Sequence, residues 1–275
     1  MGGTMSFPPA PATLLEVARD QGILLELLAS ELARAATLVV PPAPFRSRAR
    51  AGQGPFEAAL RRAPLPVIAE FKRASPSLGP FAAQADPAQQ LAAYLRGGAA
   101  ACSILAEPAR FLGDPRDFPV AKALGLPVLY KGFVCTEAHL DEAVALGADA
   151  VLLITRILGE HLAGFAAAAR VRGLEPLVEL HAPAEIPAVQ AANVRMVGWN
   201  ARNLADFSVL DAPAALLRSA FPAALLVRES GLHSPEDARA ALDRGFDAVL
   251  IGEALMRAAD PAAFLAGIRA PEVSR

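Results

Sequence analysis

Short apolar runs alternate with amphipathic stretches along most of the chain, beginning near residue 66. The runs are rich in valine, leucine and isoleucine, which is typical of strands that are buried on both faces. The pattern predicts eight strands, at 66–71, 102–107, 127–133, 150–155, 175–180, 196–201, 224–230 and 248–253. It predicts a helix after each strand, at 87–97, 116–125, 137–147, 159–172, 183–192, 211–220, 235–244 and 260–269.

The order of these elements favours a closed barrel. Eight consecutive strand–helix units predict an α/β protein with a (β/α)8 TIM barrel. Gly147 and Gly245 fall at predicted helix ends, and Ser234-Pro235 is a typical helix start. The rival fold is a doubly wound open sheet, which would place a glycine-rich phosphate loop after the first strand. The segment EFKRASPS at 70–77 is not such a loop, so the barrel is preferred.

The first 62 residues differ from the rest of the chain. Apolar residues recur at helical spacing over 13–37, and a run rich in proline, glycine and arginine follows over 39–56. A second short helix is predicted at 57–62. We therefore expect residues 1–62 to form an N-terminal helical extension with a linker, and residues 63–275 to form the catalytic barrel.

Composition and charge narrow the class of protein. Apolar residues make up 54% of the chain, the net charge is −2, and basic residues do not cluster. These values disfavour nucleic-acid and membrane surfaces, and no apolar run reaches the roughly 18 residues of a transmembrane helix. The two cysteines form no CxxC pair, and no secretory signal pattern is present, which favours a reducing compartment. We expect a cytoplasmic monomer.

Polar side chains gather where the predicted strands end, which is where barrel enzymes place their active sites. Only three of the 26 basic residues are lysines, and Lys72 and Lys131 stand at two of these strand ends. Lysine can titrate when it is desolvated, whereas arginine cannot. Leu129 and Phe133 share a face with Lys131, so we expect desolvation to lower its pKa and to make it a general acid near neutral pH. The strand ends also carry Glu70, Glu107, Thr155, Glu179, Asn200, Glu229 and Glu253.

The remaining polar residues favour a phosphorylated substrate and no metal. Gly231 in ESGLHS and Gly252 in IGEAL would let backbone N–H groups approach a phosphate at the last two strands, a common arrangement in barrels. No HxxH motif or His–Cys cluster suggests a metal site. We expect His139, His161 and His181 to lie on helix surfaces or in loops.

Several segments resemble the indole-3-glycerol phosphate synthase family of tryptophan biosynthesis. In family order they are VIAEFKRASPSLG, SILAEPARFLGD, PVLYKGF, GADAVLLI, EPLVELH, VGWNARNL, ESGLHSPED and VLIGEALMR. The resemblance spans nearly all of 66–270, and the N-terminal helix and linker resemble the extension of this family. It implies a carboxy-lyase that needs no cofactor. The reaction would convert 1-(2-carboxyphenylamino)-1-deoxyribulose 5-phosphate to indole-3-glycerol phosphate, with loss of CO2 and water.

The resemblance also implies roles for individual residues. Lys131 would be the general acid for ring closure, and Glu179 would act as acid or base in dehydration, in concert with Glu70. Lys72 would contact the substrate carboxylate or supply a second proton. The implied catalytic set is Glu70, Lys72, Lys131, Glu179, Asn200 and Ser230. The implied substrate-binding set is Ser75, Phe111, Phe133, Arg202, Leu204, Glu229, Gly231, Gly252 and Glu253.

The chain departs from the usual family pattern at several positions. Gly132 follows the strand-end lysine where aspartate is usual, Asn203 replaces another aspartate, and Arg228 takes a usually small, apolar position. Two other functions remain open. One is a related phosphate-binding barrel such as phosphoribosylanthranilate isomerase, which would use a cysteine base where Glu70 stands. The other is a non-catalytic ligand-binding barrel, for which Gly132 and Asn203 are the only support.

Overall fold

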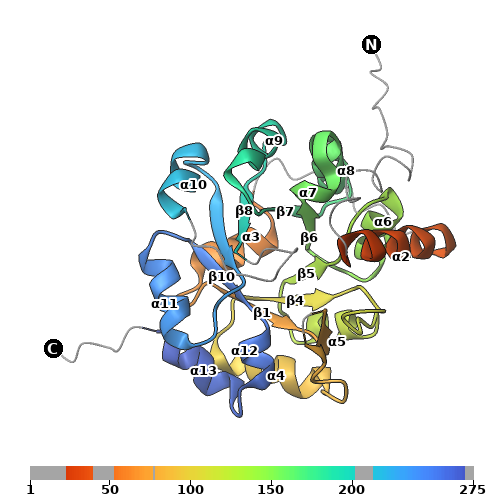
Figure 1. Cartoon of the computed structure of the whole chain (residues 1–275). Coiled ribbons are helices and arrows are strands. Elements are labelled where there is room, and N and C mark those ends of the chain that lie inside the picture. Colours follow the sequence, from red (N-terminus) through yellow and green to blue (C-terminus); the bar gives the residue numbers. More distant parts are fainter. Residues whose placement is uncertain (1–22, 40–52, 77, 202–212, 270–275) are drawn as a thin grey trace.

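Eight parallel strands close into a barrel in the computed structural model, which describes residues 23–39, 53–76, 78–201 and 213–269 (Figure 1). The order around the barrel is β1-β10-β9-β8-β7-β6-β5-β4, and β1 closes the sheet by pairing with both β4 and β10. The strands are β1 (Val67–Phe71), β4 (Ala101–Leu105), β5 (Val128–Lys131), β6 (Ala150–Ile154), β7 (Glu175–Leu180), β8 (Met196–Asn200), β9 (Leu225–Glu229) and β10 (Ala248–Ile251). The predicted (β/α)8 fold is confirmed.

A ring of helices covers the outside of the barrel (Figure 1). These helices are α4 (Pro87–Gly97), α5 (Asp117–Ala123), α6 (Glu137–Ala145), α8 (Leu162–Val171), α9 (Ile186–Ala191), α10 (Ala214–Ala220), α11 (Pro235–Asp243) and α13 (Pro261–Ile268). Each lies within a predicted helical range. The strands are buried at nearly every position, as expected for a parallel sheet with side chains packed on both faces.

Several short elements at the strand ends are not evident from the apolar pattern. They are α7 (Thr155–Leu158), the 3-10 turns at Gly159–His161 and Pro183–Glu185, α12 (Glu253–Arg257), and a hairpin of β2 (Ala74–Ser75) and β3 (Gly79–Pro80). A helix of four or five residues holds too few turns to show a period in the sequence. Strand β10 ends at Ile251, two residues earlier than predicted, because α12 begins at Glu253.

The Gly-x-Asp segments before β6 and β10 explain how these strands begin. Gly147 and Gly245 have positive φ angles of 80° and 103°, so each ends its helix in the left-handed conformation. The aspartate that follows reaches the start of the preceding strand. Asp149 Oδ2 accepts a hydrogen bond from Val128 N at 2.9 Å, and Asp247 Oδ2 accepts one from Leu226 N at 2.7 Å. These aspartates tie neighbouring strands together at the N-terminal end of the barrel.

Two helices precede the barrel strands. Helix α3 (Pro55–Arg62) crosses the N-terminal end of the barrel, where Glu175 at the start of β7 accepts N–H groups from Phe56 at 2.7 Å and Glu57 at 2.9 Å. Helix α2 (Ile23–Thr37) lies beside α6 (Figure 1). The predicted domain boundary after residue 62 remains a prediction, as does the helix predicted over residues 13–22, which lie outside the described part of the chain.

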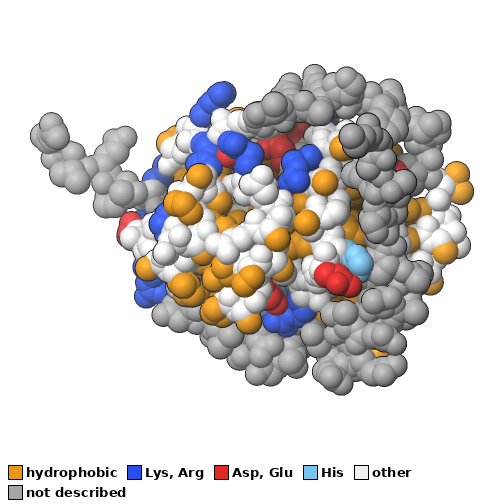
Figure 2. All heavy atoms as spheres, turned by 90° about the horizontal axis from the view of Figure 1, so that it is seen from above, with side chains coloured by type: hydrophobic (Ala, Val, Ile, Leu, Met, Phe, Trp, Pro, Cys, Tyr) orange, Lys and Arg blue, Asp and Glu red, His pale blue; other side chains and the backbone are white. Residues whose placement is uncertain are grey.

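The surface has a mixed character. On the face seen in Figure 2, lysine and arginine side chains lie among acidic, apolar and neutral side chains. Within the described ranges, no helix has both the length and the apolar character needed to cross a membrane.

Candidate active site

A cavity lies at the C-terminal ends of the strands, and its lining contains most of the residues implied by the family resemblance. Thirteen of the fifteen implied residues line it: Glu70, Lys72, Ser75, Phe111, Lys131, Phe133, Glu179, Asn200, Glu229, Ser230, Gly231, Gly252 and Glu253. Arg202 and Leu204 lie outside the described residues, as does Asn203. Side chains from β1, β5, β7, β8 and β9 therefore converge on one space, which agrees with the expected position of a barrel site.

Glu70 and Lys72 form one side of the cavity. They are two residues apart at the end of β1, so they share a face. Lys72 Nζ lies 2.8 Å from Glu70 Oε1. A side chain at Gly252, at the end of β10, would run into the Glu70 carboxylate, so this glycine leaves space for the pair. Burial alone would raise the pKa of Glu70, but the charges of Lys72 and Lys131 bring it below its usual value.

Lys131, at the end of β5, lies between two buried glutamates. Its Nζ is 2.6 Å from Glu229 Oε2 and 3.3 Å from Glu179 Oε2. We expected burial to lower its pKa, and that expectation is wrong. Burial does act in that direction, but the charges of Glu229, Glu179 and Glu70 outweigh it and raise the pKa of Lys131. Lys131 is therefore a firmly protonated ammonium group in the free site.

The two glutamates beside Lys131 differ in their protonation. Burial raises the pKa of Glu229 to about 8, with the charge of Glu179 adding to the shift and Lys131 opposing it. Burial also acts to raise the pKa of Glu179, but Lys131 and His181 bring it below its usual value. Asn200 Nδ2 donates to Glu179 Oε2 at 3.2 Å. At neutral pH the site therefore holds a protonated Glu229 next to an ionised Glu179.

Gly198 is essential to this arrangement and was not predicted. It lies in β8 two residues before Asn200, on the same face, and a Cβ there would collide with Glu229 Oε1. The clue in the sequence is a glycine in the interior of a buried strand, which often marks a close approach of another group. Gly198 thus makes room for the Glu229 carboxylate, as Gly252 does for that of Glu70.

Two aromatic rings form an apolar part of the cavity. The centroids of Phe111 and Phe133 are 6.0 Å apart and their planes are inclined by 44°. Glu107, expected in the polar ring, does not line the cavity. Its carboxylate instead accepts N–H groups from Ala109, Arg110 and Phe111 at 2.7 to 3.0 Å. Glu107 thereby fixes the loop that carries Phe111.

Thr155 is a second strand-end residue that does not reach the cavity. Its hydroxyl donates to the backbone carbonyl of Glu179 at 2.7 Å, so it braces the end of β7.

At the end of β9, Ser230 and Gly231 have positive φ angles of 62° and 70°. The chain turns sharply there, directly after Glu229, and both residues line the cavity. The Glu253 carboxylate lies 3.4 Å from Arg257.

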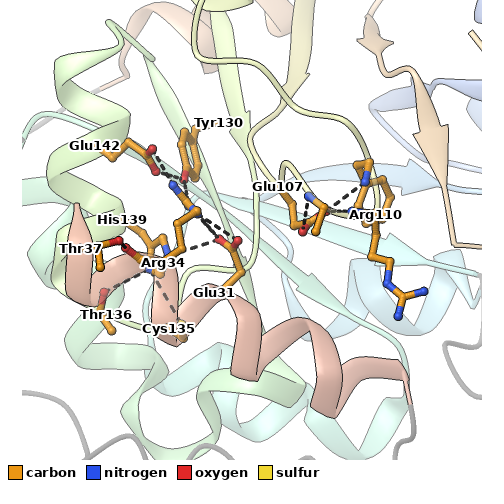
Figure 3. A network of polar contacts seen from close by, with 12 residues as sticks. Glu31, Arg34, Thr37, Glu107, Arg110, Tyr130, Cys135, Thr136, His139 and Glu142 are labelled. Atoms are coloured by element: carbon orange, nitrogen blue, oxygen red, sulfur yellow. Dashed lines mark hydrogen bonds and ion pairs between the residues drawn. The ribbon is translucent and has the colours of Figure 1, made fainter. Parts of the chain in front are cut away.

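Helix α2 adds an unpredicted wall to the cavity through Leu24 and Leu27. A polar network anchors the far end of this helix to the barrel (Figure 3). Arg34 lies 2.8 Å from Glu31 on its own helix and 2.7 Å from Glu142 on α6. Because the network depends on contacts between segments about 100 residues apart, no local sequence pattern indicates it.

Tyr130 and His139 complete the network (Figure 3). The Tyr130 hydroxyl donates to Glu142 Oε2 at 2.5 Å. His139 is fully buried and lies 3.3 Å from Glu31, so the expectation that it lies on a helix surface is wrong. His181 is in a loop as expected, but it too is buried. Both rings face carboxylates of the chain.

Tyr130 also explains the unusual Gly132. A Cβ at position 132 would lie 2.9 Å from the Tyr130 ring and 3.4 Å from Ala106. The space that an aspartate side chain would enter is therefore taken by the tyrosine that holds Glu142.

Among the described residues, no group of three histidine, cysteine, aspartate or glutamate side chains is arranged to hold a metal ion.

Comparisons with known proteins agree with this geometry. The model of the family named indole-3-glycerol phosphate synthase matches residues 31–268. The chain is 45% identical over 216 residues to indole-3-glycerol phosphate synthase 2 of Streptomyces coelicolor, over 78% of this chain and 84% of that protein. It is 42% identical over 246 residues to indole-3-glycerol phosphate synthase of Micrococcus luteus, over 88% and 90% of the two chains.

A solved structure shares the fold more distantly. Thiamine phosphate pyrophosphorylase from Pyrococcus furiosus has a TM-score of 0.55 and 17% identity, over 76% of this chain and 96% of that chain. This likeness concerns the barrel alone. The family model, by contrast, covers most of the chain, and both bacterial relatives align over more than three quarters of it. The chain belongs to the indole-3-glycerol phosphate synthase family.

Proposed function

We propose that the cavity converts 1-(2-carboxyphenylamino)-1-deoxyribulose 5-phosphate to indole-3-glycerol phosphate, CO2 and water. The observation that carries this proposal is Lys131, a partly buried ammonium held 2.6 Å from Glu229 and 3.3 Å from Glu179 at the cavity wall. Ring closure forms a bond between the aryl carbon that carries the carboxylate and the ketone carbon of the sugar. The ketone oxygen gains negative charge in this step, and an adjacent cationic acid stabilises it.

Lys131 is the group that gives the proton to this oxygen. In the free site the charges of Glu179 and Glu70 help to make Lys131 a weak acid, so the reaction needs a second source of protons. Glu229 supports Lys131 in this role, because its pKa of about 8 leaves it protonated at neutral pH and it lies in direct contact with Nζ. The proton that Lys131 loses can be replaced from Glu229. Loss of CO2 then restores the aromatic ring.

Dehydration needs a base and an acid at the same carbon–carbon bond. Glu179 is ionised and takes a proton from the carbon next to the nitrogen. Lys72 gives a proton to the departing hydroxyl group, and Glu70 at 2.8 Å holds its ammonium group in place. Asn200 keeps Glu179 in position through its 3.2 Å hydrogen bond.

The remaining implied residues bind the substrate. Phe111 and Phe133, together with Leu204, contact its aryl ring, and Arg202 contacts its carboxylate or a hydroxyl group. Ser75 and the backbone at Gly231, Gly252 and Glu253 bind the phosphate at the other end, while Ser230 supports the sugar. We also propose that the protein works as a monomer, and that it does so in the cytoplasm.

The cysteines argue against the isomerase alternative. That reaction would need a cysteine base in the site, but Cys102 and Cys135 are both buried and neither lines the cavity. Burial raises the pKa of Cys135 to about 12, which makes it a poor base.

The function is tested by mixing the purified protein with 1-(2-carboxyphenylamino)-1-deoxyribulose 5-phosphate and following the fluorescence of the indole product. We expect multiple turnovers without an added metal or cofactor. The proposal fails if micromolar protein forms no indole-3-glycerol phosphate from this compound. Size-exclusion chromatography of the active protein tests the monomer.

A further inference from the structure

His181 lies next to Glu179 and has no role in the reaction proposed above. It follows Leu180, the last residue of β7, and its side chain is 2% exposed. Its Nε2 atom lies 3.3 Å from Glu179 Oε1. Neither ring nitrogen makes a hydrogen bond of good geometry within the described part of the chain. A buried imidazole without such a bond is costly, so its position next to a site carboxylate needs a reason.

The backbone holds this imidazole firmly in place. Glu185 Oε2 accepts the backbone N–H of His181 at 2.7 Å, which closes the turn after β7. The other oxygen of Glu185 lies 3.5 Å from Arg156 Nε on α7. The turn is thus tied to a neighbouring helix, which keeps the backbone of His181 next to Glu179.

The two glutamates beside Lys131 are not equivalent in their surroundings. Glu179 is contacted through Oε2 by Lys131 and Asn200, and through Oε1 by His181. Glu229 contacts Lys131 through Oε2, while its buried Oε1 has no hydrogen-bond partner among the described residues. Donors from three residues lie around Glu179, which favours its ionised form, and a hydrogen bond with Glu179 favours the protonated form of Glu229.

We propose that His181 is a positioning residue that donates its Nε2 hydrogen to Glu179 Oε1, and thereby keeps Glu179 ionised and aimed at Lys131 while Glu229 holds the proton. This role rests on the proposed function, because it decides which glutamate serves as the base in dehydration. Without the histidine, the two carboxylates beside Lys131 would compete for one proton.

His181 suits this role as a neutral donor. Burial lowers its pKa, the charges of Arg156 and Lys131 act in the same direction, and those of Glu179 and Glu185 oppose them. A neutral imidazole carries one N–H group, and donation to Glu179 requires the tautomer that has its hydrogen on Nε2. The histidine then orients the carboxylate and leaves the net charge of the site unchanged.

Two substitutions separate this role from simple packing. His181→Phe fills the same space without a donor, and His181→Gln carries an amide N–H that can reach the position of Nε2. The control is His161→Gln, which changes a partly exposed histidine that does not line the cavity. Melting temperature is recorded for all variants, and kcat and KM are measured from pH 5 to pH 10.

For His181→Phe we expect kcat to fall about ten- to one-hundredfold with KM changed less than about threefold, the size expected for losing a hydrogen bond to a charged group. The acidic limb of the kcat profile should move to higher pH, because Glu179 becomes easier to protonate. His181→Gln should restore most of kcat and the original limb. The proposal is overturned if the acidic limb of the kcat profile does not move in His181→Phe, or if His181→Phe and His181→Gln lose kcat equally.

A second readout does not depend on turnover, so it separates this proposal from the proposed function. Infrared pH-difference spectra report protonated buried carboxyl groups, and Glu229→Gln identifies the band of Glu229. In wild-type protein we expect one buried carboxyl that titrates near pH 8. In His181→Phe a second band should appear as Glu179 gains proton occupancy. Identical spectra for the wild type and His181→Phe would refute the role of His181. If the second band appears in His181→Phe but the wild type has no synthase activity, only the proposed function is refuted.

Discussion

Replacing Gly198 with alanine should damage the site through a single added methyl group. The Cβ of an alanine would collide with Glu229 Oε1, and Glu229 is 1% exposed, so the carboxylate has little space into which it can retreat. Overpacking of a well-packed core costs about 1 to 3 kcal/mol. Displacing Glu229 also lengthens its 2.6 Å contact with Lys131.

The magnitude follows from these two effects. For a chain of this size, about 1 to 3 kcal/mol corresponds to a melting temperature that is roughly 2 to 10 °C lower. A hydrogen bond to a charged group is worth about 1.5 to 3 kcal/mol, so kcat should fall roughly ten- to one-hundredfold if the Lys131–Glu229 contact is lost in the transition state.

Gly164 provides a matched control. It lies on the exposed side of α8, and a Cβ there would meet nothing within 4 Å. Gly164→Ala should therefore stabilise the protein by about 0.5 to 1 kcal/mol and leave kcat unchanged. Differential scanning fluorimetry and the indole fluorescence assay measure both effects. If Gly198→Ala keeps the kcat and melting temperature of the wild type, our account of how Glu229 is packed against β8 is wrong.

Two further predictions concern the charges around the site. Since Glu229 has a pKa of about 8 and acts in its protonated form, kcat of the wild type should decline above about pH 8. The pH profile of Glu229→Gln should lack this alkaline limb. If the limb persists in Glu229→Gln, the decline belongs to another group. Arg34→Met should lower stability by about 3 kcal/mol, because Glu31 and Glu142 lose their cation. The Arg34→Met protein should also show a higher KM, because the wall formed by Leu24 and Leu27 loosens. Arg116→Met, at a side chain that is 90% exposed, should change neither stability nor KM. An unchanged KM in Arg34→Met would mean that this wall does not contact substrate.

The barrel could be predicted because its local patterns match its tertiary structure. Each strand is an apolar run, and the residue that follows it is placed at the barrel mouth by the topology. Glu70 and Lys72 could be assigned to one face from alternation alone, and their 2.8 Å ion pair agrees with that assignment. Short helices such as α7 and α12 were missed because they have no period to detect.

The electrostatics of the site could not be predicted from local sequence. The neighbours of Lys131 in its own strand are apolar and suggest a lowered pKa, but the charges that raise it come from three other strands. His139 and His181 were expected at the surface or in loops, and both are buried against glutamates. The partner of His139, Glu31, is distant in sequence, where periodicity carries no information. Glu179 is only two residues before His181, but the burial of this histidine depends on the elements packed around the turn.

The most direct test of the account is a single-turnover comparison of the wild type, Lys131→Met and Lys122→Met with 1-(2-carboxyphenylamino)-1-deoxyribulose 5-phosphate. Lys122 is the matched control, because it pairs with Asp149 at 2.6 Å near the N-terminal end of the barrel, away from the cavity. We predict that Lys131→Met binds the substrate but forms indole-3-glycerol phosphate at least about a hundredfold more slowly, the usual size of a general-acid contribution, while Lys122→Met keeps the wild-type rate. A Lys131→Met protein that forms product at the wild-type rate would contradict the account.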